Sequence, residues 1–117
     1  MESNEPKKMS NVLKAGFLKK RSKYLHLWKT RFCILTTKFL FAFTGIEKDT
    51  DCTMTLELEK CKDCWNTDED LGKQNSFSIR ANNMLYYFMA ENENERNEWI
   101  NLIKGHLSVD DEQLIKE

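Results

Sequence analysis

Positively charged side chains gather in one short stretch, GFLKKRSKYLHLWKTRF (residues 16–32), which holds six lysines and arginines and one histidine. Ammonium and guanidinium groups bind polyanions, and a guanidinium can hold a phosphate through two parallel hydrogen bonds. Lys29 and Arg31 are two residues apart, so on a β-strand they project from the same face. The stretch therefore predicts a site for a negatively charged partner. Its candidate residues are Lys20, Arg21, Lys23, Lys29 and Arg31.

Two other residues of this stretch, Tyr24 and Leu25, lie among the basic ones in what reads as a loop. Interfacial aromatic and aliphatic side chains enter the headgroup boundary of a membrane, so both are candidates for membrane contact. The alternative is that both pack on the rim of the fold.

Charge is unevenly distributed along the 117-residue chain. Residues 1–35 contain nine basic and two acidic residues, a net charge of +7, whereas residues 36–117 contain nine basic and seventeen acidic residues, a net charge of −8. If the fold keeps the first part on one side, its positive face suits a negatively charged partner such as a membrane surface or a nucleic acid. Nucleic acid is disfavoured, because the aromatic residues follow core periodicity and the remaining surface is acidic. A solvated basic hairpin without a ligand is the alternative.

Cysteines are the other candidates for chemistry, and Cys61 and Cys64 have the C-x-x-C spacing. A structural zinc site needs a second pair of ligands. Cys33 and Cys52 lie in or beside apolar strand patterns, and the two histidines are far apart in the sequence. A thioredoxin-like role is also disfavoured, because the motif lies in an acidic loop context. We therefore expect thiols in a reducing compartment, with no metal and no cofactor.

Catalysis is not indicated by any pattern in the sequence. There is no Ser/His/Asp set, no pair of carboxylates in an apolar setting and no glycine-rich phosphate loop, so we do not expect an enzyme. No apolar run approaches the roughly 18 residues of a membrane span, and the first residues, MESNEPKKMS, lack a signal-peptide core and a glycine for myristoylation. We expect a cytoplasmic protein.

The elements that must position the basic residues are predicted to be β-strands. Aromatic and branched residues or period-two alternation mark residues 15–20, 28–36, 38–43, 53–59, 76–81 and 84–90. The acidic connection at 60–75 is expected to hold one further short strand near Cys64 and Trp65. The sequence thus predicts a mostly β fold.

One amphipathic helix is predicted at residues 92–106. Asn92 and Glu95 resemble a capping box, and Trp99 begins an apolar series at helical spacing. This apolar stripe must cover the open end or face of the sheet. The predicted organisation is a flexible lead-in (1–11), one domain (12–107) and a polar tail (108–117).

Three segments together resemble the pleckstrin homology (PH) domain family: AGFLKK its first strand, WKTRFCIL its second, and LYYFMAENENERNEWINLI its last strand and helix. The resemblance covers roughly residues 12–107. It implies a seven-stranded barrel of two near-orthogonal antiparallel sheets, capped by the C-terminal helix. The basic stretch would then form the loop between the first two strands, at the open and positive end.

Within this family, phosphoinositide-binding members resemble one another in a lysine late in the first strand, followed after the loop by a basic residue, any residue and arginine. Here that pattern is Lys20 and then Lys29-Thr30-Arg31. The loop KRSKYLHLWKTRF is most similar to that of the protein kinase B PH domain, which implies inositol lipids phosphorylated at the ring 3-position. Ala42 stands where many trisphosphate-selective members have a tyrosine, and residues 46–52 are acidic. These differences predict lower affinity or looser selection among phosphoinositides.

The resemblance implies a non-catalytic module that binds phosphoinositide headgroups and is recruited reversibly to a cytosolic membrane leaflet. A protein-binding module on the same scaffold, with weak or no lipid binding, is the alternative. We expect a monomer.

Overall fold

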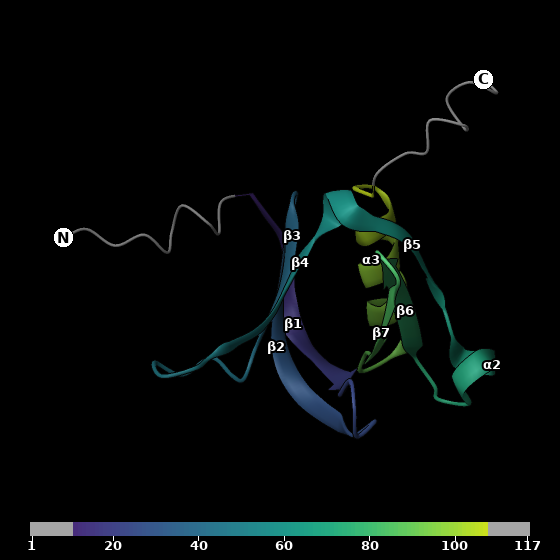
Figure 1. Cartoon of the computed structure of the whole chain (residues 1–117), viewed down its shortest axis with the longest axis horizontal. Helices are drawn as coiled ribbons and strands as arrows, with labels where there is room; N and C mark the ends of the chain where they lie inside the picture. The colour runs from purple at the N-terminus through teal and green to yellow at the C-terminus, as the bar shows by residue number, and fades with distance from the viewer. Residues whose placement is uncertain (1–10, 108–117) are drawn as a thin grey trace.

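A computed structural model describes residues 11–107 (Figure 1). The predicted tail, and all but the last residue of the predicted lead-in, lie outside the described residues. The elements in chain order are β1 (Val12–Arg21), β2 (Trp28–Thr36), β3 (Phe39–Phe43), β4 (Cys52–Glu57), the 3-10 helix η1 (Leu58–Lys60), β5 (Cys61–Asn66), α2 (Asp68–Leu71), β6 (Ser76–Ala81), β7 (Met84–Met89) and α3 (Glu93–Lys104). The mostly β architecture with one main C-terminal helix is confirmed.

Hydrogen bonds join the seven strands into one antiparallel sheet, in the order β4-β3-β2-β1-β7-β6-β5. β1 belongs to both halves of this sheet. It pairs with β2 along its length but with β7 only at Lys19↔Met89 and Lys20↔Phe88. The sheet therefore folds over at β1, and the two halves face each other (Figure 1).

The core lies between the two halves of the sheet, because one side chain in two on each strand points inward. Leu18 of β1 is buried, as are Cys33 and Leu35 of β2. The other large inward side chains are Leu40, Leu56, Leu58, Phe77, Ile79 and Phe88. Phe77 and Phe88 face each other from β6 and β7 with ring centroids 5.2 Å apart.

Helix α3 begins at the predicted cap, where Asn92 Oδ1 accepts a hydrogen bond of 2.8 Å from the Glu95 N–H. Trp99 is 1% exposed and Ile103 is fully buried, so the predicted apolar stripe enters the core. The Trp99 ring lies against Gly16 of β1, where a Cβ atom would sit 3.8 Å from the indole. The helix thus closes one end of the core.

The connection between β5 and β6 is tied to α3 by a buried arginine. Arg96 is 4% exposed, and its Nη1 lies 2.6 Å from Asp68 Oδ2. Asp68 Oδ1 in turn accepts a hydrogen bond of 2.8 Å from the Ser76 N–H. The short helix α2, which begins at Asp68, was not predicted, because a segment this short leaves no periodic signal.

Candidate functional site

The pairing of β1 with β2 brings three of the predicted site residues to one face. Lys20 pairs with Lys29, and Leu18 pairs with Arg31. Residues directly opposite in an antiparallel pair share a face, and alternate residues on a strand do so as well. Because Leu18 is buried, Lys20, Lys29 and Arg31 point to the inner side of the fold, beyond the apolar core and next to the β1–β2 loop.

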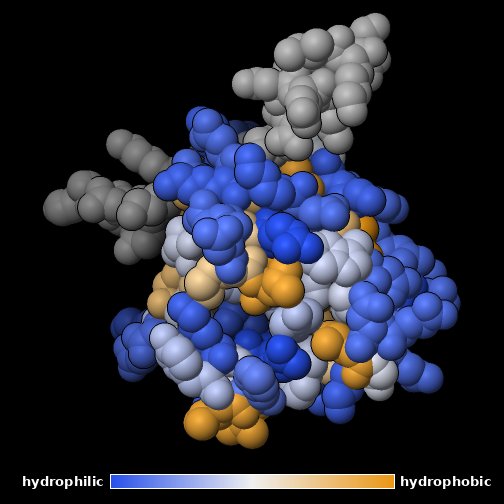
Figure 2. Space-filling view, turned by 45° about the vertical axis from the view of Figure 1, so that its right-hand side comes forward, coloured by the Kyte–Doolittle hydropathy of each residue, from blue (hydrophilic) through white to orange (hydrophobic). Residues whose placement is uncertain are grey.

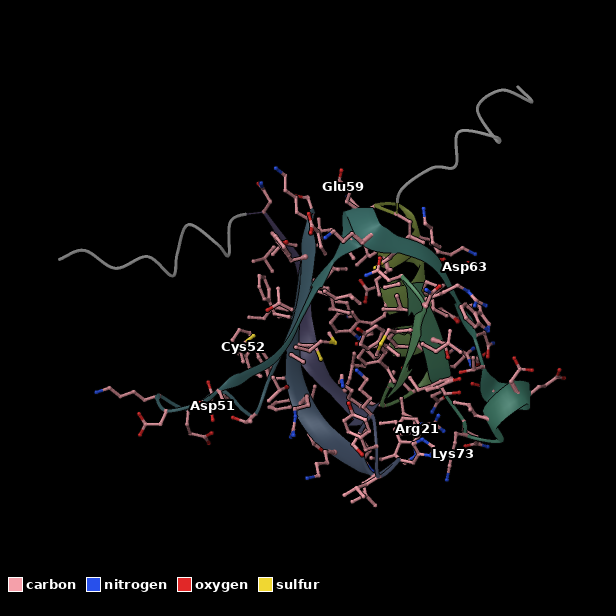
Figure 3. The ribbon with its side chains drawn as sticks, viewed as in Figure 1. Arg21, Asp51, Cys52, Glu59, Asp63 and Lys73 are labelled. Atoms are coloured by element: carbon pink, nitrogen blue, oxygen red, sulfur yellow. The ribbon has the colours of Figure 1, made fainter. Side chains whose placement is uncertain are left out.

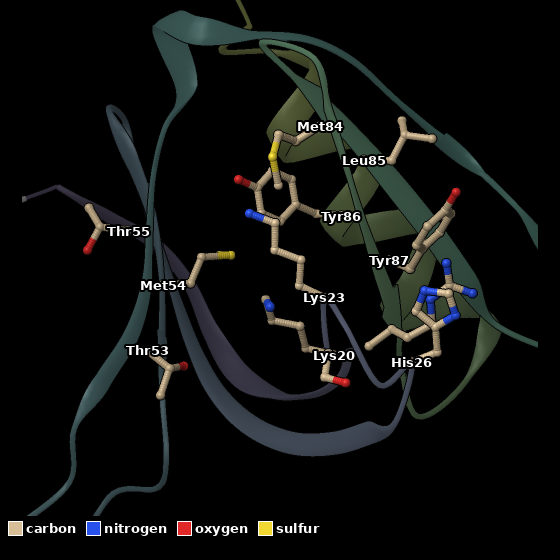
Figure 4. A pocket seen from close by; sticks show the side chains of 12 residues that line it. Lys20, Lys23, His26, Thr53, Met54, Thr55, Met84, Leu85, Tyr86 and Tyr87 are labelled. Atoms are coloured by element: carbon tan, nitrogen blue, oxygen red, sulfur yellow. The ribbon is translucent and has the colours of Figure 1, made fainter.

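Two cavities occupy this end of the fold. The smaller, of about 170 Å³, is lined by Lys20, Ser22, Lys23, Lys29, Arg31 and Thr53. The larger, of about 400 Å³, shares Lys20 and Lys23 with it and extends between β4 and β7. Figure 4 shows Lys20 and Lys23 reaching from the β1–β2 hairpin into the space between these strands. All five predicted cations therefore line this concave region, four of them the smaller cavity and Arg21 the larger one.

These cations repel one another without a compensating carboxylate. Burial, together with the nearby Arg31 and Lys23, lowers the pKa of Lys20 below its ordinary value of 10.5. The ion pairs found within residues 11–107 involve other cations, namely Lys14, Lys60 and Arg96. The region therefore has a positive electrostatic potential, which a bound anion would neutralise.

Arg31 keeps most of its hydrogen-bonding capacity. One guanidinium nitrogen, Nη1, donates to the Thr30 carbonyl at 3.0 Å, which helps to fix the side chain. A guanidinium has five N–H donors, so donors remain for an anion. Behind Arg31 on the same face, burial raises the pKa of the Cys33 thiol to about 12, so this thiol stays neutral beside the cations.

The loop between β1 and β2 is closed by two hydrogen bonds. The Ser22 N–H donates to the Leu27 carbonyl at 2.7 Å, and the Leu27 N–H donates to Ser22 Oγ at 2.9 Å. Tyr24 is 84% and Leu25 is 73% exposed, so neither packs on the rim of the fold. Figure 2 shows an apolar group projecting at the lower end of a mostly hydrophilic face, the end at which Figure 1 places this loop.

The fifth predicted residue, Arg21, lies on the opposite face of β1 from Lys20. Its guanidinium carbon lies 4.1 Å from the centroid of the Tyr87 ring, a cation–π contact. Figure 3 shows Arg21 at the lower end of the molecule, on the side of β7 and away from Asp51 and Cys52. Arg21 therefore lies outside the smaller cavity, but it lines the larger one together with Lys20, Lys23 and Tyr87.

The larger cavity includes residues that sequence reasoning missed. Tyr86 of β7 lines it, and Lys20 Nζ lies 5.9 Å from the centroid of the Tyr86 ring. Thr53 and Met54 of β4 line it from the other side. The alternation in MLYYFM could have placed Tyr86 on the same face as the core residue Phe88, but only the folded sheet brings β4 and β7 to the β1–β2 loop.

The C-x-x-C motif has a structural explanation. Cys61 and Cys64 would point to opposite faces of a regular strand, but the register of β5 shifts between Cys61 and Asp63 and both thiols are buried. Burial raises the pKa of Cys61 to about 11 and that of Cys64 to about 12, whereas metal ligation needs thiolates. Within residues 11–107, no three His, Cys, Asp or Glu side chains are grouped to hold a metal ion.

In the part of the chain that the structure describes, no helix has the length and apolar character needed to cross a bilayer.

Comparison with known proteins gives both relatives and similar structures. Src kinase-associated phosphoprotein 2-A of Xenopus laevis is 32% identical over 114 residues, which are 89% of this chain but only 34% of that protein. Pleckstrin homology domain-containing protein 1 of Arabidopsis thaliana is 27% identical over 99 residues, 80% of this chain and 68% of that protein. The chain thus spans about a third of the length of the Xenopus laevis relative.

Among solved structures, the C-terminal PH domain of pleckstrin in complex with D-myo-Ins(1,2,3,4,5)P5 has a TM-score of 0.69 and 26% sequence identity, covering 82% of this chain and 98% of that one. The family model for the PH domain matches residues 12–108. This match covers most of the 117 residues, and it agrees with the seven strands and terminal helix of the fold. The chain belongs to the PH domain family.

Proposed function

We propose that this PH domain is a non-catalytic module that binds phosphoinositide headgroups and thereby attaches reversibly to a cytosolic membrane leaflet. One observation carries the proposal: Lys20, Lys23, Lys29 and Arg31 line one concave region, and no carboxylate within residues 11–107 pairs with them. The pleckstrin PH domain solved with an inositol pentakisphosphate supports the same ligand class.

The chemistry of the region fits a phosphorylated ring. Each charge-assisted hydrogen bond contributes roughly 1.5–3 kcal/mol, so three or four of them support about micromolar binding after entropic costs. Lys20, Lys29 and Arg31 hold one phosphate in the smaller cavity. Lys23 and Tyr86 border the larger cavity, whose volume of about 400 Å³ accommodates the ring.

The β1–β2 loop provides the membrane contact in this proposal. Tyr24 and Leu25 are exposed at its tip, so they enter the headgroup boundary while the cations hold the lipid. Leu27, which is also exposed, adds to this apolar tip. Arg21, stacked on Tyr87, lines the larger cavity and offers the bound ring a further cation beside Lys23.

The finer choice of lipid rests on the similarity of the loop to that of protein kinase B, which favours headgroups phosphorylated at the ring 3-position. Ala42 offers no hydroxyl to such a ligand. It is fully buried and pairs with Cys33, which follows Arg31 by two residues on the same face of β2. We therefore propose that the domain prefers 3-phosphorylated inositol lipids. It should discriminate among phosphoinositides less strictly than a PH domain that has a tyrosine at the position of Ala42.

A panel of phosphatidylcholine vesicles, each containing one mono-, bis- or trisphosphorylated phosphoinositide, tests this function. We expect sedimentation of the protein with phosphoinositide vesicles, above that with phosphatidylserine vesicles of equal charge, and release by soluble inositol polyphosphate. Equal sedimentation with both vesicle types would contradict headgroup recognition. Binding of a protein partner that soluble inositol polyphosphate does not displace would favour the alternative, a protein-binding module.

A further inference from the structure

A groove opens on the outer face of the sheet, where β1 and β7 separate. The two strands pair only at Lys19↔Met89 and Lys20↔Phe88. Beyond Met89 the chain leaves β1, and the Ala90 N–H donates to the Asn75 carbonyl at 2.8 Å instead. The resulting cavity has a volume of about 460 Å³. It is lined by Phe17, Leu18, Lys19, Thr30, Gln74, Asn75, Met89, Ala90 and Glu91.

One wall of the groove, the end of the β5–β6 connection, is held in place from both sides. Asn75 adopts a left-handed backbone conformation, with φ of 61°, which directs the chain into β6. The Ser76 N–H next to it is bound by Asp68, which is paired with the buried Arg96 of α3. A groove fixed in this way loses little conformational entropy when it is occupied.

The groove has an apolar floor and a rim with one charge of each sign. Phe17 is 53% exposed, and its ring packs edge-on against Phe32 with centroids 5.1 Å apart. Met89 adds a flexible thioether that adapts to an aromatic or aliphatic guest. Lys19 and Glu91 are exposed, and no ion pair within residues 11–107 includes either of them. A polyanion does not suit this groove, because Glu91 would repel it.

We propose that this groove binds an extended segment of a partner protein. An aromatic or long aliphatic side chain of the segment fills the space over Phe17 and Met89, with an acidic residue facing Lys19 and a basic residue facing Glu91. Buried aromatic anchors contribute most of the affinity of such interfaces, and complementary charges fix the register. Met89 pairs with Lys19, and Glu91 follows two residues later, just past the end of β7, so both charges lie on the rim of this one groove.

This arrangement limits the sequence of the partner. Lys19 and Glu91 line the same groove as Phe17 and Met89, so the acidic and basic residues must lie close to the apolar anchor, on either side of it. The groove lies on the face of β1 opposite to Lys20. The domain could therefore hold a headgroup and a protein segment at the same time.

Selection from a random linear peptide library displayed on phage, against the immobilised chain, tests the inference. We expect enriched peptides with one aromatic or long aliphatic residue between an acidic and a basic one. Phe17→Ser and Met89→Thr should each weaken binding of the enriched peptides by about tenfold or more, provided that circular dichroism shows an unchanged fold. If no peptide is enriched, or if both variants bind the enriched peptides as the wild type does, the proposal is wrong.

Charge reversal gives a sharper test, because both rim residues are exposed. In the double variant Lys19→Glu/Glu91→Lys, the selected peptides should have the acidic and basic residues in the opposite order. Lys20→Glu is the matched control: it removes a headgroup contact on the other face of β1 and should leave peptide binding unchanged. If the double variant selects peptides with the same order of acidic and basic residues as the wild type does, the proposed contacts with Lys19 and Glu91 are wrong.

Two other occupants of the groove, an anion or a second copy of the chain, can be detected, and either would overturn the proposal. If soluble inositol polyphosphate shifts the backbone amide signals of Phe17, Lys19 and Met89 in NMR spectra more than those beside Lys29, the groove is a second anion site. If sedimentation shows concentration-dependent association that Phe17→Ser abolishes, the groove holds a second copy of the chain.

Discussion

Replacing Lys20 by methionine should stabilise the fold and weaken ligand binding at the same time. Lys20 is partly buried beside Arg31 and Lys23, and this environment lowers its pKa. Burial of the ammonium group is the larger cost, and repulsion by Arg31 and Lys23 adds to it. In this partly exposed setting Lys20→Met should therefore gain about 1 kcal/mol. For a domain of this size, that gain raises the melting temperature by about 4–8 °C. Methionine keeps the apolar stem of the side chain and removes only the charge.

The pH dependence of this gain has a definite sign. Because the folded-state pKa of Lys20 lies below its ordinary value of 10.5, its charge destabilises the fold below the folded-state pKa. This cost disappears as the pH rises through that value toward 10.5. The difference in melting temperature between variant and wild type should therefore shrink at high pH. It should also shrink at high salt, because ions screen the repulsion.

The same variant should bind phosphoinositide vesicles about 10- to 100-fold more weakly, since it loses one charge-assisted hydrogen bond worth roughly 1.5–3 kcal/mol. Thermal unfolding followed by circular dichroism and vesicle sedimentation measure the two effects. Lys62→Met is the matched control, because Lys62 is exposed on β5 and outside the ion pairs of residues 11–107. A melting temperature that is unchanged or lower, at every salt concentration, would refute the repulsion argument.

Three further predictions concern the fold that positions the site. Trp99→Ala should cost roughly 3–5 kcal/mol in urea unfolding, because the indole is buried, and a melting temperature near that of wild type would show that α3 does not close the core. Asn92→Ala should cost about 1 kcal/mol through loss of its hydrogen bond to Glu95, and an effect below a few tenths would count against the cap. Asp68→Asn should be less stable than wild type at neutral pH. Burial opposes ionisation of Asp68, but Arg96 and the neighbouring N–H groups outweigh this effect and hold the pKa of Asp68 below 3.8. The difference in stability between variant and wild type should therefore vanish as acid protonates Asp68 in the wild type. A difference in stability that stays constant with pH would contradict this account.

The central part of the site could be predicted because it depends on strand alternation. The spacing of Lys29 and Arg31 predicts a shared face, and their pairing with β1 adds Lys20. Alternation also explains why Arg21, which follows Lys20 directly, lies outside the smaller cavity. It stacks on Tyr87 and lines the larger cavity instead.

Other features could not be predicted because they depend on long-range pairing or on a local irregularity. Tyr86 and Thr53 approach the loop only after β7 and β4 take their places in the sheet. The inward direction of both Cys61 and Cys64 depends on a register shift in β5 that no periodicity reveals. The ion pair of Asp68 with Arg96 joins residues 28 positions apart.

The affinity of Arg31→Ala for phosphoinositide vesicles at near-physiological salt tests the central claim most directly. Arg31 lines the smaller cavity from β2, and its side chain makes no ion pair within residues 11–107, so the variant should keep its fold. We predict an unchanged melting temperature with vesicle binding reduced by about tenfold or more. Wild-type affinity in a folded Arg31→Ala variant would contradict the assignment of the inward cations to a lipid headgroup.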